Sequence, residues 1–497
     1  MKIVRLAFIM AALEQYLGLV IGFAVIAVLS RLLTPAEIGI SAIATSITMI
    51  VFSVREFATP EFLIQRREVS RDDLRTASTI LMGLIIILSL LLFVASGWLE
   101  NFYGAVELKA FLLLSILSAI SDAFSLPIFT MMRRDMAFGT ITRIKTIGSL
   151  ITAIAVIGFA WHGYSYLSIA IGGLIGSLAT TILALIARPS YLVFKPSIAS
   201  WRHLVDFGRY KGATYITDRI YEALPQLVLG RVMPMASVGI FNRANAVCGI
   251  PDRLLMSSIF TVAFPALAAA AREGSNIKET YLRSLGYIAV IYWPGVILMA
   301  ILAEPAVRIV LGPGWEEAIL LVQLIALSSV FWFPIILTYP LLMALGENRD
   351  AFVSNFIGRI VAAVILCAAS FHSLTAIALS QFISMPFQMM MSFRYVRRHV
   401  PFTSRQIFSA ISGSMIVTFI SMLGPTIYVL ARGFGGHLTV LDAAICMILA
   451  AVGWFGGLII VKHPFLEEIR GVTDMVNWRG LLMRKTSAPR GTQTARP

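Results

Sequence analysis

The chain alternates long runs of apolar residues with short segments that are rich in polar and charged residues. A helix needs ~20 mostly apolar residues to cross the hydrocarbon core of a bilayer, and many of the runs reach that length. The pattern therefore predicts an all-α polytopic membrane protein. We predict fourteen membrane-spanning helices, at residues 7–30, 38–59, 77–98, 108–130, 142–161, 164–187, 208–230, 238–264, 284–303, 317–342, 352–370, 373–393, 408–430 and 438–461.

The composition excludes an ordinary soluble domain. Of the 497 residues, 58% are hydrophobic and 13% are charged, whereas a soluble domain carries about 25% charged residues. The cysteines Cys248, Cys367 and Cys446 lie inside apolar runs and lack the spacing of a disulfide framework or a zinc site. We therefore expect them to be packing residues, and we expect no metal site.

The positions of the basic residues set the orientation of the spans. With the N-terminus placed inside, 30 of the 40 Lys and Arg residues fall in inside segments and five in outside loops. This asymmetry predicts that both termini are cytoplasmic, and it explains the net charge of +14 without nucleic acid. The other five basic residues lie within spans: Arg55, Arg219, Arg243, Arg253 and Arg359.

The terminal segments and the absence of common enzyme motifs limit the possible functions further. Lys2 and Arg5 precede an apolar run as in a signal peptide, but the run is too long and contains Glu14, so we expect it to be retained. No P-loop, HExxH or GxSxG motif is present, and the outside loops are short. We expect no enzyme activity and no cofactor. Residues 462–497 form a predicted cytoplasmic basic tail, either helical on the membrane surface or in water, or coil.

Two pairs of segments indicate an internal repeat. Residues 28–40 (VLSRLLTPAEIGI) resemble residues 228–240 (VLGRVMPMASVGI), and residues 135–145 resemble residues 349–359. Two six-helix halves in the same orientation follow, a transporter design that places the site between the halves. The predicted parts are an N-terminal bundle at 1–200, a C-terminal bundle at 201–400, two additional helices at 401–461 and the tail at 462–497.

Four phrases carry a resemblance to a known family: RLLTPAEIG, FLIQRREVSRDDLRTA, GPGWEEAILLVQLIAL and MALGENRDAF. Together with the 6+6+2 plan they resemble the polysaccharide transporter (Wzx-type oligosaccharide flippase) family of the MOP superfamily, over about residues 1–460. The resemblance implies two bundles in a V that open alternately to each side. It also implies export of oligosaccharide units on undecaprenyl pyrophosphate across the bacterial inner membrane, for exopolysaccharide, capsule or O-antigen synthesis. The implied partners are this lipid-linked oligosaccharide, membrane lipids, a polysaccharide polymerase and a chain-length regulator.

Ionisable residues within spans are the candidates for the site, because a pyrophosphate and several sugars must cross ~30 Å of hydrocarbon. Arg253 is the leading candidate for a phosphate or acidic-sugar contact, since the guanidinium fork donates two hydrogen bonds. The predicted substrate-binding residues are Arg253, Arg219, Arg55, Arg359, Lys145 and Tyr215. The predicted coupling residues are Glu14, Asp218, Glu222 and Asp252.

Each candidate also has a plainer interpretation. Arg219 and Glu222 are three residues apart and can pair on one helix face, and Asp252 and Arg253 can form an internal ion pair. In related lipid-carrier flippases, as the resemblance implies, spans one, two and eight bring basic residues into the cavity. Glu14 departs from that pattern, which leaves proton or cation coupling open. Lys145, matched with Arg359 by the repeat, either flanks the inner mouth or anchors the chain at the membrane.

Three other functions compete with polysaccharide export. A multidrug or cation antiporter of the same superfamily has twelve spans and, by resemblance, acidic residues in its first half. The fourteen predicted spans and the five arginines within spans argue against this function here. A flippase for the peptidoglycan lipid precursor shares the fourteen-span plan. A membrane polymerase or glycosyltransferase needs a positioned acid or base, or a substantial polar loop, and the outside loops are too short for one.

Overall fold

The computed structural model describes residues 2–58, 70–105, 107–189, 196–199, 201–253, 276–433 and 438–469. These residues are largely helical and contain no strand. The first helices are α1 (Lys2–Leu32), α2 (Pro35–Ser53), η1 (Val54–Ala58), α4 (Arg71–Tyr103), α5 (Leu108–Arg134), α6 (Phe138–Trp161), α7 (Leu167–Ala187) and α8 (Trp201–Val232). After the helical residues 235–253 come α10 (Ile277–Ile301), α11 (Ala303–Val310), α12 (Glu317–Ser328), η3 (Ser329–Trp332), α13 (Phe333–Ala344), α14 (Asn348–Ser370), α15 (Leu374–His399), α16 (Ser404–Arg432) and α17 (Val440–Val461).

Twelve stretches of the described residues are long and apolar enough to cross a membrane. Each coincides with one of the predicted spans, and one of them, Glu317–Ala344, joins α12, η3 and α13. The two remaining predicted spans fall on α8, which carries many charged residues, and on a segment that is described only up to residue 253. The chain is a polytopic helical membrane protein, and the count of fourteen spans stays a prediction.

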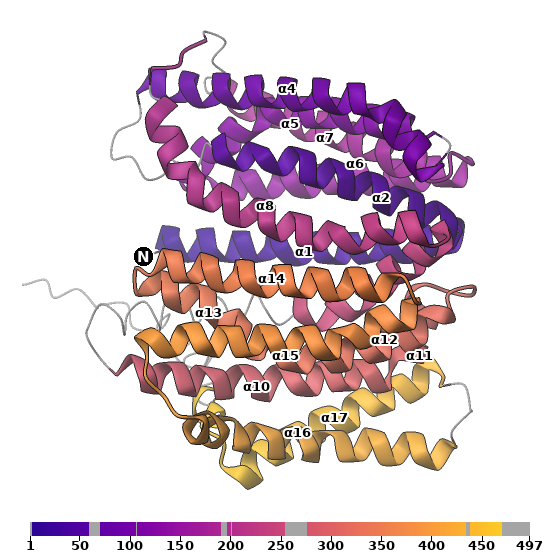
Figure 1. Cartoon of the computed structure of the whole chain (residues 1–497), viewed down its shortest axis with the longest axis vertical. Coiled ribbons are helices and arrows are strands. Elements are labelled where there is room, and N and C mark those ends of the chain that lie inside the picture. The colour runs from indigo at the N-terminus through magenta and orange to yellow at the C-terminus, as the bar shows by residue number, and fades with distance from the viewer. Residues whose placement is uncertain are drawn as a thin grey trace, which may run out of the picture.

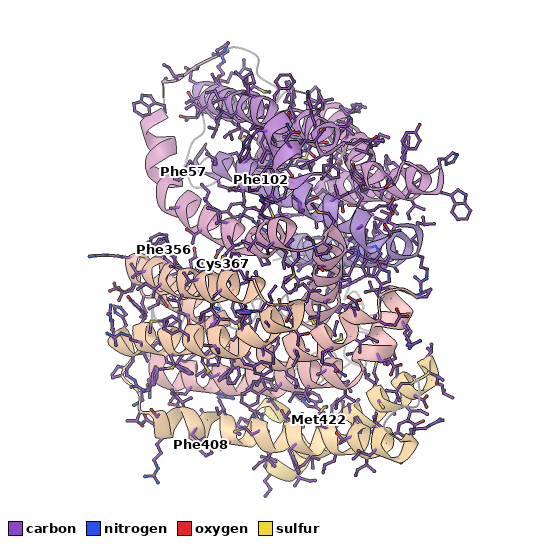
Figure 2. All side chains as sticks on the ribbon, turned by 45° about the vertical axis from the view of Figure 1, so that its right-hand side comes forward. Phe57, Phe102, Phe356, Cys367, Phe408 and Met422 are labelled. Atoms are coloured by element: carbon purple, nitrogen blue, oxygen red, sulfur yellow. The ribbon has the colours of Figure 1, made fainter. Side chains whose placement is uncertain are left out.

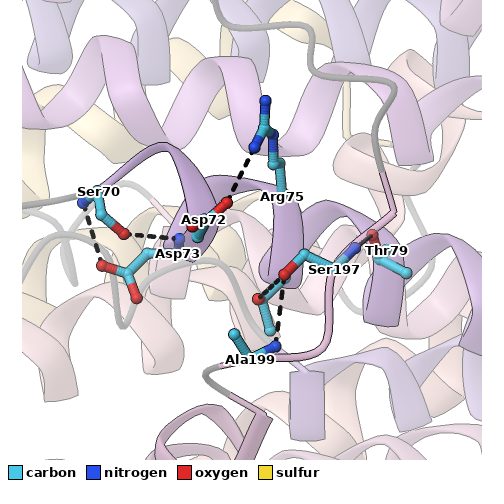
Figure 3. A network of polar contacts seen from close by, with 8 residues as sticks. Ser70, Asp72, Asp73, Arg75, Thr79, Ser197 and Ala199 are labelled. Carbon is cyan, nitrogen blue, oxygen red and sulfur yellow. Dashed lines mark hydrogen bonds and ion pairs between the residues drawn. The ribbon is translucent and has the colours of Figure 1, made fainter.

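Capping side chains fix where several helices begin. The Thr34 hydroxyl accepts from the backbone N–H of Glu37 at the start of α2, and Glu37 accepts in return from the backbone of Thr34. Ser70 and Asp73 form the same reciprocal box at the start of α4 (Figure 3). Such capping boxes satisfy backbone N–H groups of the first helical turn that have no partner within the helix. They therefore fix the residue at which the loop ends and the helix begins. Beside this cap, the backbone N–H of Ser197 donates to Thr79 of α4.

The helices form two neighbouring groups (Figure 1). The first contains α1, α2 and α4–α7, and the second contains α10–α15, with α16 and α17 packed along α10 on its far side. Helix α8 packs against both α2 and α14, so it bridges the two groups. The division at residue 200 that the repeat predicts stays a prediction, since α8 contacts both groups.

The outward faces of the helices are apolar. Leu90 and Val94 of α4, and Phe408 and Phe419 of α16, are large side chains that stay exposed. Figure 2 shows the exposed Phe408 on the lowest helix of the molecule. Large apolar patches of this kind are not tolerated on soluble monomers, so these faces fit contact with lipid chains.

Candidate functional site

A cavity of about 770 Å³ lies between the two groups of helices. Its walls come from α1, α2, α7 and α8 on one side and from α10, α12, η3, α14 and α15 on the other, together with residues 235–253. Its charged lining residues are Glu222, Arg243, Asp252, Arg253 and Arg359. Among the lining residues that the structure describes, three guanidinium groups against two carboxylates give a net positive charge. Serine, threonine, asparagine and glutamine side chains supply further hydrogen-bonding groups: Ser41, Thr45, Ser46, Gln226, Asn242, Asn245, Ser329, Ser380, Gln381 and Ser384.

Arg359 of α14 is held in place by groups from α8 and η3. Its Nε lies 3.5 Å from Oδ1 of Asp218, and the same oxygen accepts a hydrogen bond of 2.9 Å from the amide of Asn355. The guanidinium carbon lies 4.3 Å from the ring centre of Tyr221 and 5.4 Å from that of Trp332. Arg359 therefore enters the cavity with its charge largely compensated by an acid and two aromatic faces.

Arg219 and Glu222 form the ion pair that their spacing on α8 predicts, with 2.6 Å between nitrogen and oxygen. Arg219 also lies over the ring of Tyr215, 4.6 Å from its centre. Of these three residues, only Glu222 lines the cavity. In this structure Arg219 and Tyr215 thus contact each other instead of the cavity.

Arg253 and Asp252 are neighbours at the end of the described part of their helix, and both line the cavity. The Arg253 side chain is exposed and lies over the ring of Phe23 in α1, 5.8 Å from its centre. Arg243 precedes Arg253 by ten residues. Its side chain is 7% exposed and makes no ion pair with any described residue. The same helical segment thus places a buried arginine, Arg243, and an exposed arginine, Arg253, in one cavity.

Lys145 and Glu14 lie in a second, smaller pocket of about 520 Å³ inside the first group of helices. Lys145 Nζ lies 2.6 Å from Glu14 Oε1. In the same pocket, Asp122 accepts a hydrogen bond of 2.6 Å from Ser177. Neither Lys145 nor Glu14 lines the central cavity, so the predicted match of Lys145 with Arg359 does not bring these two residues into one site.

Arg55 lies in η1, where the second predicted span ends. It is half-buried, and it lies close enough to Asp122 for an electrostatic interaction. Arg55 does not line the central cavity.

One end of the central cavity is sealed where α1 and α2 meet residues 235–239 and the α11–α12 connection. A Cβ atom built on Gly39 would lie 1.9 Å from the carbonyl oxygen of Met235, so the two backbones touch. Trp315 Nε1 donates 2.8 Å to the carbonyl oxygen of Ser30, and Arg31 donates 2.6 Å to that of Ile309. By the predicted orientation, this sealed end faces the outside.

Sequence reasoning underrated or missed three residues of this site. Arg243 is named there only as one of the basic residues within spans, because nothing in the sequence distinguishes a buried arginine from one near a span end. Asn355 is missed, although it precedes Arg359 by four residues and therefore shares its helix face. Trp332 lies in the short 3-10 turn η3, and no sequence signal marks it as a cavity residue.

The helices and the polar cavity between them are typical of a membrane transporter. A family model described as "Polysaccharide biosynthesis protein" matches residues 28–320, and the chain belongs to this family. This confirms the predicted relationship to Wzx-type polysaccharide transporters.

Curated relatives share low sequence identity with the chain. The lipopolysaccharide biosynthesis protein WzxC of Escherichia coli is 23% identical over 314 residues, which are 62% of this chain and 63% of WzxC. The succinoglycan biosynthesis transport protein ExoT of Rhizobium meliloti is 22% identical over 347 residues, 66% of this chain and 67% of ExoT. The match to WzxC thus spans less than two thirds of that relative.

Solved structures share the fold over most of the chain. The lipid II flippase MurJ in an inward closed conformation superimposes with a TM-score of 0.71, at 14% identity, covering 93% of this chain and 99% of MurJ. An inward-facing multidrug transporter of the MATE family gives 0.64, at 13% identity, covering 79% of this chain and 98% of that one. At these identities the likeness shows the architecture alone.

Proposed function

We propose that the protein moves lipid-linked oligosaccharide units from the cytoplasmic to the outer leaflet by alternating access through the central cavity. The observation that carries the proposal is a cavity between two helical groups that is net positive and sealed at one end. Such a cavity is suited to an anionic, sugar-bearing head group.

The physical problem is the barrier to the head group, since each unsatisfied polar group in hydrocarbon costs several kcal/mol. The arginines of the cavity offer charge and paired donors to phosphate oxygens, and the amide and hydroxyl side chains offer hydrogen bonds to sugars. The carrier tail stays in lipid, so only the head group needs this passage. Arg253 is exposed in the cavity and stays the proposed first contact.

The proposed coupling residues fall into two places. Asp218, Glu222 and Asp252 lie at or beside the central cavity, where a change of protonation alters the charge that the cargo meets. Glu14 lies apart from them, in the pocket that it shares with Lys145. We propose that this pocket couples an ion or proton to the motion of α1 relative to α6, the two helices that the ion pair joins.

The names of the relatives favour polysaccharide export over the competing functions. The curated relatives are proteins of lipopolysaccharide, succinoglycan and teichuronic acid biosynthesis. The peptidoglycan-precursor flippase and the multidrug transporter match only as folds. We therefore propose an exported polymer repeat unit as the cargo, and a polymerase and a chain-length regulator as the proteins that act on it next.

A deletion strain tests this function. Cells without the protein should stop exporting polymer and should accumulate lipid-linked oligosaccharide that a membrane-impermeant sugar oxidant cannot reach from outside. Complementation with the wild-type chain should restore both properties. Lipid-linked units that accumulate on the outer surface without being polymerised would instead indicate a polymerase and contradict the proposal.

A further inference from the structure

Arg243 is the most unusual charged residue of the central cavity. It lies in the eighth predicted span and is 7% exposed. Its Nε is buried without a hydrogen-bond partner, and no acidic side chain of the described residues pairs with it. The other arginines are different, because Arg219 and Arg359 have carboxylate partners and Arg253 is exposed.

An unpaired guanidinium inside a membrane protein is costly. Removing a charge from water carries a penalty of several kcal/mol, which an acidic partner normally offsets. Charged residues within spans are therefore rare unless they pair or serve a ligand. Arg243 lines the cavity, so a negatively charged ligand in that cavity is the partner that the described residues do not supply.

The position of Arg243 distinguishes it from Arg253. Ten residues of helix separate the two, so their Cα atoms lie roughly 15 Å apart along the axis at 1.5 Å per residue. Gly239, which forms the sealed end with α2, precedes Arg243 by one helical turn. Ser41 and Ala42 of α2 line the cavity just below the same seal. Arg243 thus lies at the sealed end of the cavity, and Arg253 lies deeper toward its other end.

We propose that Arg243 forms a terminal anion subsite, which receives a phosphate group of the cargo directly below the sealed end of the cavity. The proposal rests on the proposed function for the identity of the cargo. Asn242 and Asn245, neighbours of Arg243 in the cavity lining, are available as further donors. An anion that reaches this subsite lies against the helix whose contact with α2 must separate when the outer end opens.

The first test is the thermal stability of the ligand-free, full-length protein in detergent. Removing a buried charge that has no partner should not destabilise the fold, so Arg243→Gln is expected to melt at or above the wild-type temperature. Arg359→Gln is the matched control, because it leaves Asp218 without its ion pair and should melt lower. A melting temperature of Arg243→Gln several degrees below the wild type would show a structural role and overturn the proposal.

The second test is binding, with farnesyl pyrophosphate as the probe and farnesol as the uncharged control. The wild type should be stabilised by farnesyl pyrophosphate and not by farnesol. Arg243→Gln should bind the pyrophosphate at least tenfold more weakly, which corresponds to ~1.4 kcal/mol, and Arg243→Lys should recover part of the loss. Affinity of Arg243→Gln within twofold of the wild type would overturn the subsite.

The two hypotheses fail separately. A wild type that ignores farnesyl pyrophosphate overturns the anion subsite, even if the deletion strain loses polymer export as proposed. Conversely, a deletion strain with normal export contradicts the proposed function, while the loss of pyrophosphate binding in Arg243→Gln would still support the subsite.

Discussion

Gly39 and Gly239 contact each other in a symmetric way. A Cβ atom on Gly39 would lie 1.9 Å from the carbonyl oxygen of Met235, and one on Gly239 would lie 1.9 Å from that of Pro35. Gly39 and Gly239 are 200 residues apart, as are Pro35 and Met235, and 200 is the offset of the sequence repeat. The two related segments thus meet at the sealed end of the cavity. This is the contact that a two-fold axis between parallel repeats would produce, although the repeat itself stays a prediction.

Adding one methyl group at this contact should open the sealed end. Gly39→Ala or Gly239→Ala places a Cβ where no real atom fits, and the obstacle is backbone that cannot move aside as a side chain does. We expect a several-fold increase in the rate at which an impermeant thiol reagent, added from outside, labels a cysteine introduced at Ala246 in the cavity. The background would lack the three native cysteines.

Gly97→Ala is the matched control for that substitution. Gly97 lies within α4 and has no atom within 4 Å of the position of an added Cβ. The Gly97→Ala variant should be labelled at the same rate as the protein that carries the introduced cysteine alone. Equal rates for Gly39→Ala and Gly97→Ala, with both proteins folded, would show that the glycine contact does not seal the cavity.

Substitutions of Lys145 and Glu14 should have non-additive effects on the free energy of unfolding, because the two side chains form an ion pair. Glu14→Gln leaves a half-buried ammonium group without its partner, at a cost of ~1–3 kcal/mol. The double variant Glu14→Gln/Lys145→Gln should recover about 1–2 kcal/mol relative to the sum of the two single effects. Thermal unfolding of the four proteins measures this coupling.

Polymer export by the same four proteins distinguishes two roles of Glu14: the ion-pair partner of Lys145, and the carrier of a coupling ion or proton. If Glu14 carries the coupling ion or proton as proposed, the double variant regains stability and stays inactive. Recovery of polymer export together with stability would mean that Glu14 serves only as the partner of Lys145.

Arg253 should be required for export. Arg253→Ala removes an exposed guanidinium from the cavity lining, and it is expected to abolish polymer export at near-normal protein level. Arg308→Ala is a suitable control, because Arg308 lies in α11 with Glu304 as its partner and does not line the cavity. Unchanged export by Arg253→Ala would remove Arg253 from the substrate path.

His463 should make the stability of the protein depend on pH. The ring is buried just after the C-terminal end of α17, where Nδ1 accepts from the backbone N–H of Phe465 and Nε2 contacts Ser414 Oγ at 3.1 Å. The Ser414 hydroxyl donates its proton to Gly286, so the ring must donate to Ser414 and is neutral. Burial lowers the pKa of His463.

The sign of this effect follows from proton binding. Below about pH 6.5, His463 binds a proton in the unfolded chain but stays neutral in the folded chain, because its pKa is lower there. The free energy of unfolding therefore falls as the pH decreases. The melting temperature should therefore drop between pH 7 and pH 5, and less steeply in His463→Gln. The exposed His372→Gln should keep the full wild-type dependence; the same slope in both variants would exclude His463 as the cause.

The spans and the family were predictable because their signals are local. Apolar runs are read directly from the sequence, and the predicted span at residues 208–230 falls on the helix α8 in spite of its charged residues. The Arg219–Glu222 pair was predictable too, because three residues along a helix bring two side chains onto one face.

The partners of Lys145 and Arg359 were not predictable, since they come from distant helices. Glu14 precedes Lys145 by 131 residues, and Asp218 precedes Arg359 by a similar interval. A single sequence does not reveal which helix faces meet. For the same reason, the sequence did not separate the buried Arg243 from the exposed Arg253.

Transbilayer movement of a labelled polyprenyl-pyrophosphate-linked oligosaccharide in proteoliposomes tests the central claim most directly. The purified full chain would be reconstituted with and without a proton gradient, and a membrane-impermeant reagent would report how much sugar reaches the outer surface. We expect the wild type to speed this movement at least tenfold over protein-free vesicles, and Arg253→Ala to lose the acceleration. Movement no faster than in empty vesicles under either condition would contradict a cavity that carries sugar phosphates across the membrane.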